Sequence, residues 1–408
     1  MLIEKITKAT LGIKDHRIVR IQGDTQKITI HLDGIKRHRL PCSVCSERSP
    51  IRDRLQERTW RHVPFWNIPV FITYRPARVA CPRCGIKVEK IPWSQGKSYL
   101  TKPLSITMAT WARILPMDVV SRFFNVCWNA VYSAVRQAVQ YGLDHRDKSR
   151  TIILGVDEIS RKKGHVYHTN IYDLLGKKLL GSYEGRAFES LASFFESWGE
   201  DNLKNITGIC CDMWDPYIKA IKLYCPFALM VFDKFHIVRH LLDAVNKVRK
   251  EENERLKKTD PDILKGTRYI WLKNPWNLKD SQKERLGYLE KLNLKINRAY
   301  LLKEYFRDFW TSLYRSDAKR FLDRWFWIAT HSRIKPMRDF AWLLREHEEG
   351  ILAYSDLPID NGSVEAMNNN AKAISHRARG YRSSRTFSTI LMHCLGGLEL
   401  PFWVHRFS

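Results

Sequence analysis

Three acidic residues lie where the chain can assemble a site for divalent metal ions. Asp157 and Asp212 each end a short apolar run of the kind that forms a buried strand. Glu365 follows the turn signal at 360–363 and lies one turn inside a helical pattern. Hard divalent ions prefer carboxylate ligands. Acids at two strand ends and on a late helix suit two-metal phosphoryl transfer, so we expect these three to be catalytic and to bind Mg²⁺ or Mn²⁺.

Other acids compete for these roles, because the chain has 43 of them. Glu158 directly follows Asp157, but alternation along a strand predicts that the two side chains point to opposite faces. Asp215 precedes a proline and suits the start of the next helix. The acids at 346–349 are typical of a solvated helix face. Position therefore favours the three residues chosen.

Asp233 and His236 are a further candidate pair. They are three residues apart after an apolar run, so they can share one face of a helix. One interpretation is an accessory metal, phosphate or proton-relay contact near the acids. The other is a helix cap and a packed histidine, and the sequence leaves both open.

The segment 149–408 must position the acids, and it follows a charged linker at 146–150. Three strand-like runs come first, at 151–157, 165–172 and 178–183. A helix-like stretch at 188–199, a strand-like run at 205–211, a helix-like stretch at 215–223 and a strand-like run at 227–232 follow in that order. This order predicts a ribonuclease-H-like α/β core, in which the first and fourth strands are neighbours. A helical, tryptophan-rich block at about 240–355 is then an insertion before Glu365.

Four cysteines near the N-terminus form two pairs with the spacing of a metal site. They are Cys42, Cys45, Cys81 and Cys84. Two such pairs can complete a tetrahedral thiolate site, and four protein ligands indicate a structural rather than a catalytic zinc ion. The long gap can hold a β-hairpin, so residues 1–98 are predicted to form a zinc-ribbon-like module; two unrelated cysteine pairs are the alternative. The five other cysteines lie in apolar runs and are expected to be buried.

Residues 99–148 are predicted to contain a helix-turn-helix. Two short helical patterns occupy 117–136, with a turn near 125–127. The side chains expected to face outward into a DNA major groove are Trp128, Asn129, Tyr132, Ser133 and Arg136. A helical hairpin without DNA-binding function gives the same pattern.

A basic segment follows the predicted Glu365 helix. Its arginines, which suit phosphate binding, are Arg377, Arg379, Arg382 and Arg385. A solvated basic face is the alternative interpretation.

The composition agrees with a polyanionic partner. The 408 residues include 69 Lys and Arg against 43 Asp and Glu, for a formal net charge of +26. Such a surplus favours nucleic acid or an anionic membrane surface. No apolar run approaches the roughly 18 residues of a membrane span. The start of the chain lacks the apolar stretch of a signal peptide, so we expect a cytoplasmic protein acting on nucleic acid.

Four motifs together resemble the bacterial insertion-sequence DDE transposases of the ISL-three (ISL3) family. They are Gly155-Val156-Asp157-Glu158, Cys211-Asp212-Met213-Trp214, the stretch from Phe232 to Arg239, and the stretch from Asn361 to Asn369. The resemblance spans nearly the whole chain and implies that Asp157, Asp212 and Glu365 are the catalytic metal-binding triad. It further implies binding to terminal inverted repeats, strand cleavage by water, and joining of the freed 3′-hydroxyl to target DNA.

The sequence therefore predicts a multidomain α+β transposase with zinc-ribbon-like, helix-turn-helix and ribonuclease-H-like parts. The expected partner is double-stranded DNA, both element ends and target, with a homodimer or higher assembly in the active complex, no membrane, and a place at the bacterial nucleoid. The alternatives are a non-catalytic DNA-binding regulator and another ribonuclease-H-like nuclease.

Overall fold

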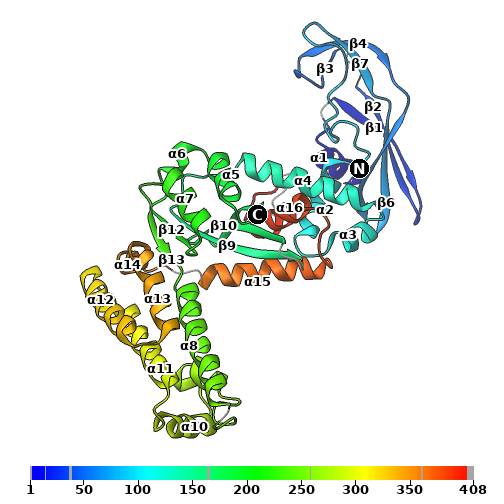
Figure 1. Cartoon of the computed structure of the whole chain (residues 1–408). Helices are drawn as coiled ribbons and strands as arrows, with labels where there is room; N and C mark the ends of the chain where they lie inside the picture. Colours follow the sequence, from blue (N-terminus) through cyan, green and yellow to red (C-terminus); the bar gives the residue numbers. More distant parts are fainter. Residues whose placement is uncertain are drawn as a thin grey trace. The chain divides into compact units, whose positions relative to one another are not determined.

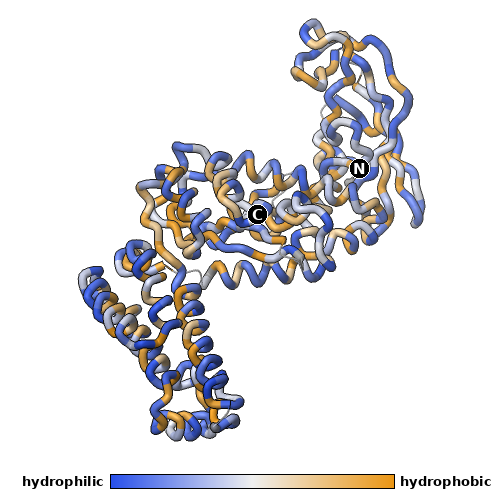
Figure 2. The backbone as a smooth tube through the Cα atoms, viewed as in Figure 1, coloured by the Kyte–Doolittle hydropathy of each residue, from blue (hydrophilic) through white to orange (hydrophobic). Residues whose placement is uncertain are grey.

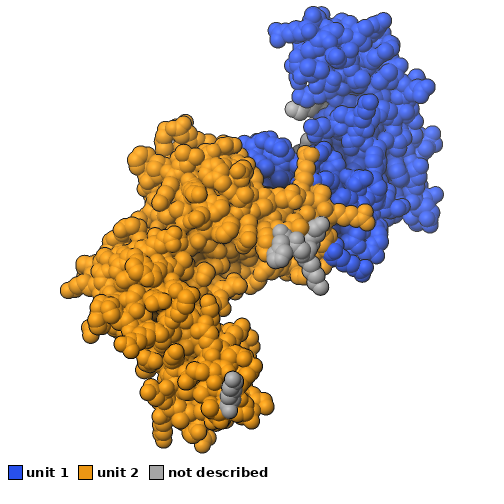
Figure 3. All heavy atoms as spheres, in the orientation of Figure 1, with its two compact units in different colours: residues 1–146, 377–379, 389–408 blue, residues 147–376, 380–388 orange. Residues whose placement is uncertain are grey.

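The computed structural model describes residues 2–13, 15–35, 39–162, 166–257, 259–359 and 362–401. The chain divides into two compact units, shown in Figure 3. Unit 1 contains residues 1–146, 377–379 and 389–408, and unit 2 contains residues 147–376 and 380–388. The division after residue 146 falls at the charged linker. The last helix crosses the division, because its C-terminal half packs in unit 1, where His393 Nε2 lies 2.7 Å from the carbonyl oxygen of Ala109.

Unit 1 begins with two four-stranded sheets (Figure 1). Its first elements are α1 (Leu2–Leu11), β1 (His16–Gly23), β2 (Ile28–Gly34), β3 (Arg39–Pro41), β4 (Arg48–Arg54), β5 (Arg58–Phe65), β6 (Ile68–Tyr74), β7 (Ala77–Cys81) and β8 (Gly85–Val88). One sheet has the order β1-β2-β6-β5 and the other has the order β3-β4-β7-β8. The buried indoles of Trp60 and Trp93 pack edge to face at 5.8 Å and anchor the core of the first sheet.

Three helices complete unit 1. They are α2 (Lys102–Ala112), α3 (Met117–Phe123) and α4 (Trp128–Asp144). Asn125 has a φ of 46°, a left-handed conformation that asparagine tolerates better than most residues, and it turns the chain between α3 and α4. Val131 and Val135 of α4 are buried, so α4 presents a packed face and an open face. Cys127 lies at the surface as the N-cap of α4, which corrects the expectation that it is buried; Cys210, Cys211 and Cys225 are buried.

Unit 2 is built on one five-stranded sheet. Its elements in chain order are β9 (Ile153–Lys162), β10 (Val166–Asp173), β11 (Lys178–Glu184), α5 (Phe188–Trp198), α6 (Glu200–Leu203), β12 (Gly208–Cys211), α7 (Asp215–Tyr224) and β13 (Leu229–Phe232). The strand order is β11-β10-β9-β12-β13. β10 is antiparallel to β9 and β11, whereas β12 is parallel to both β9 and β13. The five predicted strands are observed, and the first and fourth of them are neighbours. The first strand continues past the predicted end at Asp157 to Lys162, because its pairing with β10 extends that far, so Asp157 lies inside the strand and not at its end.

A helical block follows the sheet. It contains α8 (Lys234–Leu256), α9 (Arg268–Leu272), α10 (Asp280–Glu290), α11 (Lys295–Phe306), α12 (Arg315–His331), α13 (Lys335–Glu346) and α14 (Glu348–Asp356), with short 3₁₀ turns at Pro275–Asn277 and Arg307–Thr311. The first of these helices begins at Lys234, directly after Asp233, whose carboxylate caps it by accepting from the Phe235 N–H. Its buried residues Ile237, Leu241 and Val245 recur at helical spacing. Figure 2 shows the same alternation of apolar and polar positions along the helices of the block.

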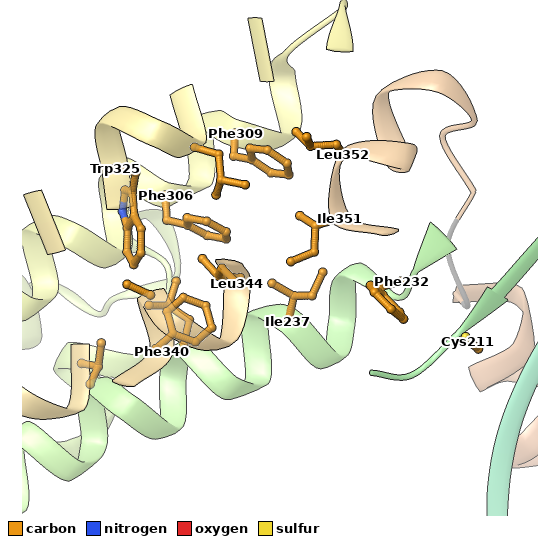
Figure 4. Packing of buried hydrophobic residues seen from close by; sticks show 14 of the residues in the cluster. Cys211, Phe232, Ile237, Phe306, Phe309, Trp325, Phe340, Leu344, Ile351 and Leu352 are labelled. Atoms are coloured by element: carbon orange, nitrogen blue, oxygen red, sulfur yellow. The ribbon is translucent and has the colours of Figure 1, made fainter. Parts of the chain in front are cut away.

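The core of this block is continuous with the core of the sheet. Figure 4 shows Phe306, Trp325 and Phe340 packed together, with Ile237 of α8 between them and Phe232 of β13. α14 approaches β13 closely at Gly350, where an added Cβ would meet the Phe232 ring at 2.4 Å. The helical block is therefore anchored on the sheet edge, at the strand from which α8 departs.

The chain ends with α15 (Gly362–Arg377) and α16 (Ser384–Leu395). The first part of the turn predicted at 360–363, residues 360 and 361, lies outside the described residues. Within the described part of the chain, no helix combines the length and the apolar character needed to cross a membrane.

Candidate active site

Two of the predicted acids meet because their strands are parallel neighbours. β9 and β12 pair in register from Gly208 opposite Ile153 to Cys210 opposite Gly155. Two residues further along each strand, Asp212 comes level with Asp157. Asp212 directly follows the last residue of β12, whereas Asp157 lies inside β9, which continues to Lys162 and pairs Asp157 with Asn170 of β10. The two acids therefore meet at the carboxyl end of β12, where ligand sites in sheets with parallel strands occur.

The structure adds a histidine to this pair. Ligand atoms of Asp157, Asp212 and His236 all lie within 4.8 Å of one another. His236 Nε2 is 2.9 Å from Asp212 Oδ1 and 3.7 Å from Asp233 Oδ2. The side chains of His236 and Asp212 are 21% and 20% exposed, so the cluster opens to solvent. Of the two interpretations left open for Asp233 and His236, Asp233 is a helix cap and His236 lies at the acids.

The electrostatics of the cluster favour a bound cation. Burial and the neighbouring Asp212 carboxylate raise the pKa of Asp157 to about 7, from an ordinary value of 3.8. Burial lowers the pKa of His236, but the carboxylates of Asp212, Asp233 and Asp157 outweigh it and raise the pKa overall. The raised pKa values of Asp157 and His236 both indicate an excess of negative charge in a cluster that is partly shielded from solvent. The oxygen-rich donor set fits a hard divalent ion, with the imidazole as an additional ligand or a partner of Asp212.

A buried amide from α15 holds the first acid in place. Asn368 Nδ2 donates to Asp157 Oδ2 at 2.6 Å, and the Tyr172 hydroxyl donates to Asn368 Oδ1 at 2.5 Å. Asn170 Nδ2 also donates to Asn368 Oδ1, at 3.3 Å. Sequence reasoning missed this role. The available signal was the position of Asn368 in the Glu365 motif, three residues after the glutamate, which places both on neighbouring positions of one helix face.

Glu365 itself is not brought into the acidic cluster. It lies in the first turn of α15 with an exposed side chain. Within the residues that the structure describes, the group assembled around Asp157 contains Asp212 and His236 but not Glu365. The same helix reaches the site through Asn368, so a metal-binding role for Glu365 stays a prediction.

The residue beside Asp157 has a different partner. Glu158 Oε1 lies 3.5 Å from Arg186 Nη1 and does not join the metal-ligand group. Burial raises the pKa of Glu158, the Arg186 guanidinium opposes the shift, and the Asp212 carboxylate adds to it. Glu158 therefore lies close enough to Asp212 for its pKa to be affected, but its ion-pair partner is Arg186.

The N-terminal cysteines converge as predicted. The sulfurs of Cys42, Cys45, Cys81 and Cys84 lie within 4.8 Å of one another, and Cys45 Sγ is 3.5 Å from Cys81 Sγ. Although burial raises it, the backbone N–H groups of Cys84 and Arg83 lower the pKa of the Cys81 thiol to about 6. Residues between the pairs form strands β4 to β7, including the β5–β6 hairpin. Four convergent sulfurs fit a tetrahedral thiophilic ion.

The predicted outward face of α4 is accessible. Trp128 stacks on Tyr132 with ring centroids 5.4 Å apart. Trp128, Asn129 and Arg136 are exposed, while Tyr132 and Ser133 are partly exposed. At helical spacing Asn129, Ser133 and Arg136 lie away from the buried Val131 and Val135, whereas Trp128 and Tyr132 border the packed face. Contact of this face with DNA stays a prediction.

The arginines after α15 differ from one another. Arg377 donates to the carbonyl oxygens of Ile114 at 2.7 Å and Arg113 at 3.2 Å, so its guanidinium is already engaged within unit 1. Arg379, Arg382 and Arg385 have exposed side chains. These three remain the better candidates for phosphate contacts.

Two carboxylates brought together by adjacent parallel strands form the kind of site that phosphoryl-transfer enzymes use to hold divalent metals. The family model of ISL3-type DDE transposases matches residues 154–391 and so covers the acidic cluster and the helical block. The chain belongs to this family; it is an insertion-sequence transposase of the DDE type.

Characterised relatives match over most of their length. The transposase of insertion sequence element IS1001 from Bordetella parapertussis is 26% identical over 394 residues, covering 95% of this chain and 97% of the relative. The transposase of element IS1557 from Mycobacterium tuberculosis is 27% identical over 383 residues, covering 87% of this chain and 86% of the relative. The similarity therefore extends through both units.

Proposed function

We propose that the chain binds the terminal inverted repeats of an insertion sequence, cleaves a strand at each end, and joins the freed 3′-hydroxyl to target DNA. The observation that carries the proposal is the convergence of Asp157 and Asp212 at one sheet edge, with the pKa of Asp157 raised to about 7. The strand order β11-β10-β9-β12-β13, antiparallel on one side of β9 and parallel on the other, supports a ribonuclease-H-like core.

Mg²⁺ or Mn²⁺ would be held by Asp157, Asp212 and Glu365. A pair of such ions activates the attacking oxygen and stabilises the leaving oxygen in an in-line displacement. The protein supplies the fixed carboxylates and the hydrogen bond from Asn368 that orients one of them. His236 holds the Asp212 carboxylate from the side of α8.

The remaining parts are assigned to end recognition. The four cysteines would hold a structural Zn²⁺ ion that stabilises the N-terminal module. The open face of α4, from Trp128 to Arg136, would enter a major groove, and Arg379, Arg382 and Arg385 would contact phosphates. Two ends must meet for joining, so a homodimer or larger assembly at the nucleoid is expected in the active complex.

The test is an in vitro reaction on labelled duplexes that end in the inverted repeats bounding the insertion element that encodes this chain. With Mg²⁺, nicks at the repeat boundary should appear first, followed by products joined to a target plasmid. Omission of the divalent ion should leave binding but neither product. Cleavage without joining would indicate a nuclease, and binding without cleavage in either metal would indicate a DNA-binding regulator.

A further inference from the structure

Arg186 packs against two aromatic rings in unit 2. It lies in the connection between β11 and α5. Its guanidinium carbon is 5.0 Å from the centroid of the Tyr167 ring and 4.8 Å from that of the Trp214 ring. The Trp214 indole N–H also donates to the Arg186 carbonyl oxygen at 2.8 Å. Side chain and backbone are thus fixed together, which reduces the conformational entropy that binding a ligand would cost.

The position of Arg186 places it beside the acidic cluster. Its ion-pair partner Glu158 is the residue after Asp157 in β9, and Trp214 lies two residues after Asp212. The charges of Asp212 and His236 both influence the Glu158 carboxylate. The guanidinium is therefore a fixed positive charge at the edge of the sheet that carries the predicted catalytic acids.

The guanidinium is only weakly satisfied by its carboxylate partner. The distance of 3.5 Å to Glu158 Oε1 exceeds the roughly 2.7–2.9 Å of a strong charge-assisted hydrogen bond. The Arg186 side chain is 47% exposed, so donors of its planar fork remain open to solvent. An arginine that packs against aromatic rings and keeps donors exposed is suited to a phosphate, which its fork can bind in two places.

We infer that Arg186, held in position by Tyr167 and Trp214, binds the non-bridging oxygens of a DNA phosphate next to the bond that is cut. The inference rests on the proposed function, because it assumes that the DNA end occupies the acidic cluster. Neutralising a phosphate there would offset its repulsion from Asp157, Asp212 and Glu158. Arg186 would touch the substrate directly, and Trp214 would act by positioning it.

The experiment combines a protein change with a DNA change, using the full-length chain. Binding is measured with Ca²⁺ for the inverted-repeat duplex and for duplexes with a neutral methylphosphonate at each phosphate near the cleavage position. Arg186→Gln should weaken binding of the unmodified duplex about tenfold and reduce the slope of log affinity against log salt by about 1. At one phosphate, the methylphosphonate should weaken wild-type binding but cause no further loss in Arg186→Gln.

Two variants separate a phosphate contact from a structural role. If Arg186 served only to neutralise Glu158, Glu158→Gln/Arg186→Gln would regain wild-type sensitivity to the methylphosphonate; our inference predicts that the double variant stays insensitive. Arg186→Lys keeps the charge and should restore the salt slope. Arg268→Gln is the matched control, because Arg268 is also an exposed arginine stacked on a ring, 5.6 Å from the Tyr269 centroid.

In the Arg268→Gln control, the fold-loss of affinity from the substitution and the fold-loss from a methylphosphonate should multiply at every phosphate, because the two changes act independently. The same independence at every phosphate in Arg186→Gln would overturn the inference. Cleavage of the unmodified duplex by the wild-type chain with Mg²⁺ is measured in parallel. A chain that cleaves but shows multiplying losses keeps the proposed function and loses the role of Arg186. A chain that shows the predicted coupling but does not cleave keeps the phosphate contact and loses the proposed reaction.

Discussion

Asp157 is the residue on which the chemistry of the site depends most. Its carboxyl group is buried beside a second carboxyl group, and this environment opposes its ionisation when no metal is bound. The same environment favours a divalent cation, which replaces the proton. Proton binding and metal binding at Asp157 are therefore expected to compete.

This competition predicts how stability depends on pH. Between about pH 4 and about pH 7 the folded chain retains a proton on Asp157 that the unfolded chain releases, so stability without divalent ions falls as pH rises through this range. Asp157→Asn should lose this part of the dependence. Melting temperatures of both proteins, measured without added Mg²⁺, give the comparison, and Mg²⁺ should raise the wild-type value near neutral pH. An equal slope in the two proteins would contradict the shifted pKa.

Asn368 orients Asp157, and its removal should impair catalysis more than binding. Asn368→Ala removes the hydrogen bond to Asp157 Oδ2 and leaves Tyr172 without its buried acceptor. Loss of a group that orients a metal ligand typically costs about 10–100-fold, so cleavage should fall by that factor while affinity for the repeat is retained. The neighbouring Asn369 is exposed, and Asn369→Ala is the control. Equal cleavage rates in the two variants would argue against a positioning role.

At the scale of elements, α15 is the helix that joins the predicted third acid to the site. Asn368 and Glu365 lie three residues apart on it, and Asn368 reaches Asp157. If α15 delivers Glu365 to a metal once DNA and ions are present, Glu365→Gln should reduce Mg²⁺-dependent cleavage by on the order of 100-fold or more. Glu346→Gln, an exposed acid on α13, is the control and should cleave normally. Normal cleavage by Glu365→Gln would remove Glu365 from the triad.

The cysteine cluster is the second element whose role can be measured directly. Cys45→Ser removes one of four convergent sulfurs and should abolish stoichiometric zinc, as determined by elemental analysis of the purified protein. Because the ion would tie the turn between β3 and β4 to the turn between β7 and β8, the variant should also melt at a lower temperature. Cys127→Ser lies outside the cluster and should keep its zinc. Zinc retained by Cys45→Ser would contradict a four-thiolate site.

The sequence was informative where a local pattern determines the structure. The apolar runs before Asp157 and Asp212 predict their strands, and parallel pairing then brings the acids together. Paired cysteines likewise predict their own convergence. The contributions of His236 and Asn368 depend on where α8 and α15 pack against the sheet, which no local pattern encodes.

At the scale of the whole molecule, charge and connectivity support one function. A net charge of +26 gives the chain a general affinity for DNA that is expected to fall steeply with salt. Unit 2 holds the acidic cluster within this positive background, so a DNA backbone attracted to the chain would meet a local site that is negative like the DNA itself. We propose that a divalent cation bound by Asp157 and Asp212 would remove this repulsion and allow catalysis.

The most direct test of this claim compares single-turnover cleavage of the inverted-repeat duplex by the wild-type chain, Asp157→Asn and Asp212→Asn. Both variants should bind the duplex like the wild type and fold normally, yet show no cleavage with Mg²⁺ or Mn²⁺. Cleavage at the wild-type rate by either variant would contradict the assignment of the two acids as the catalytic metal ligands.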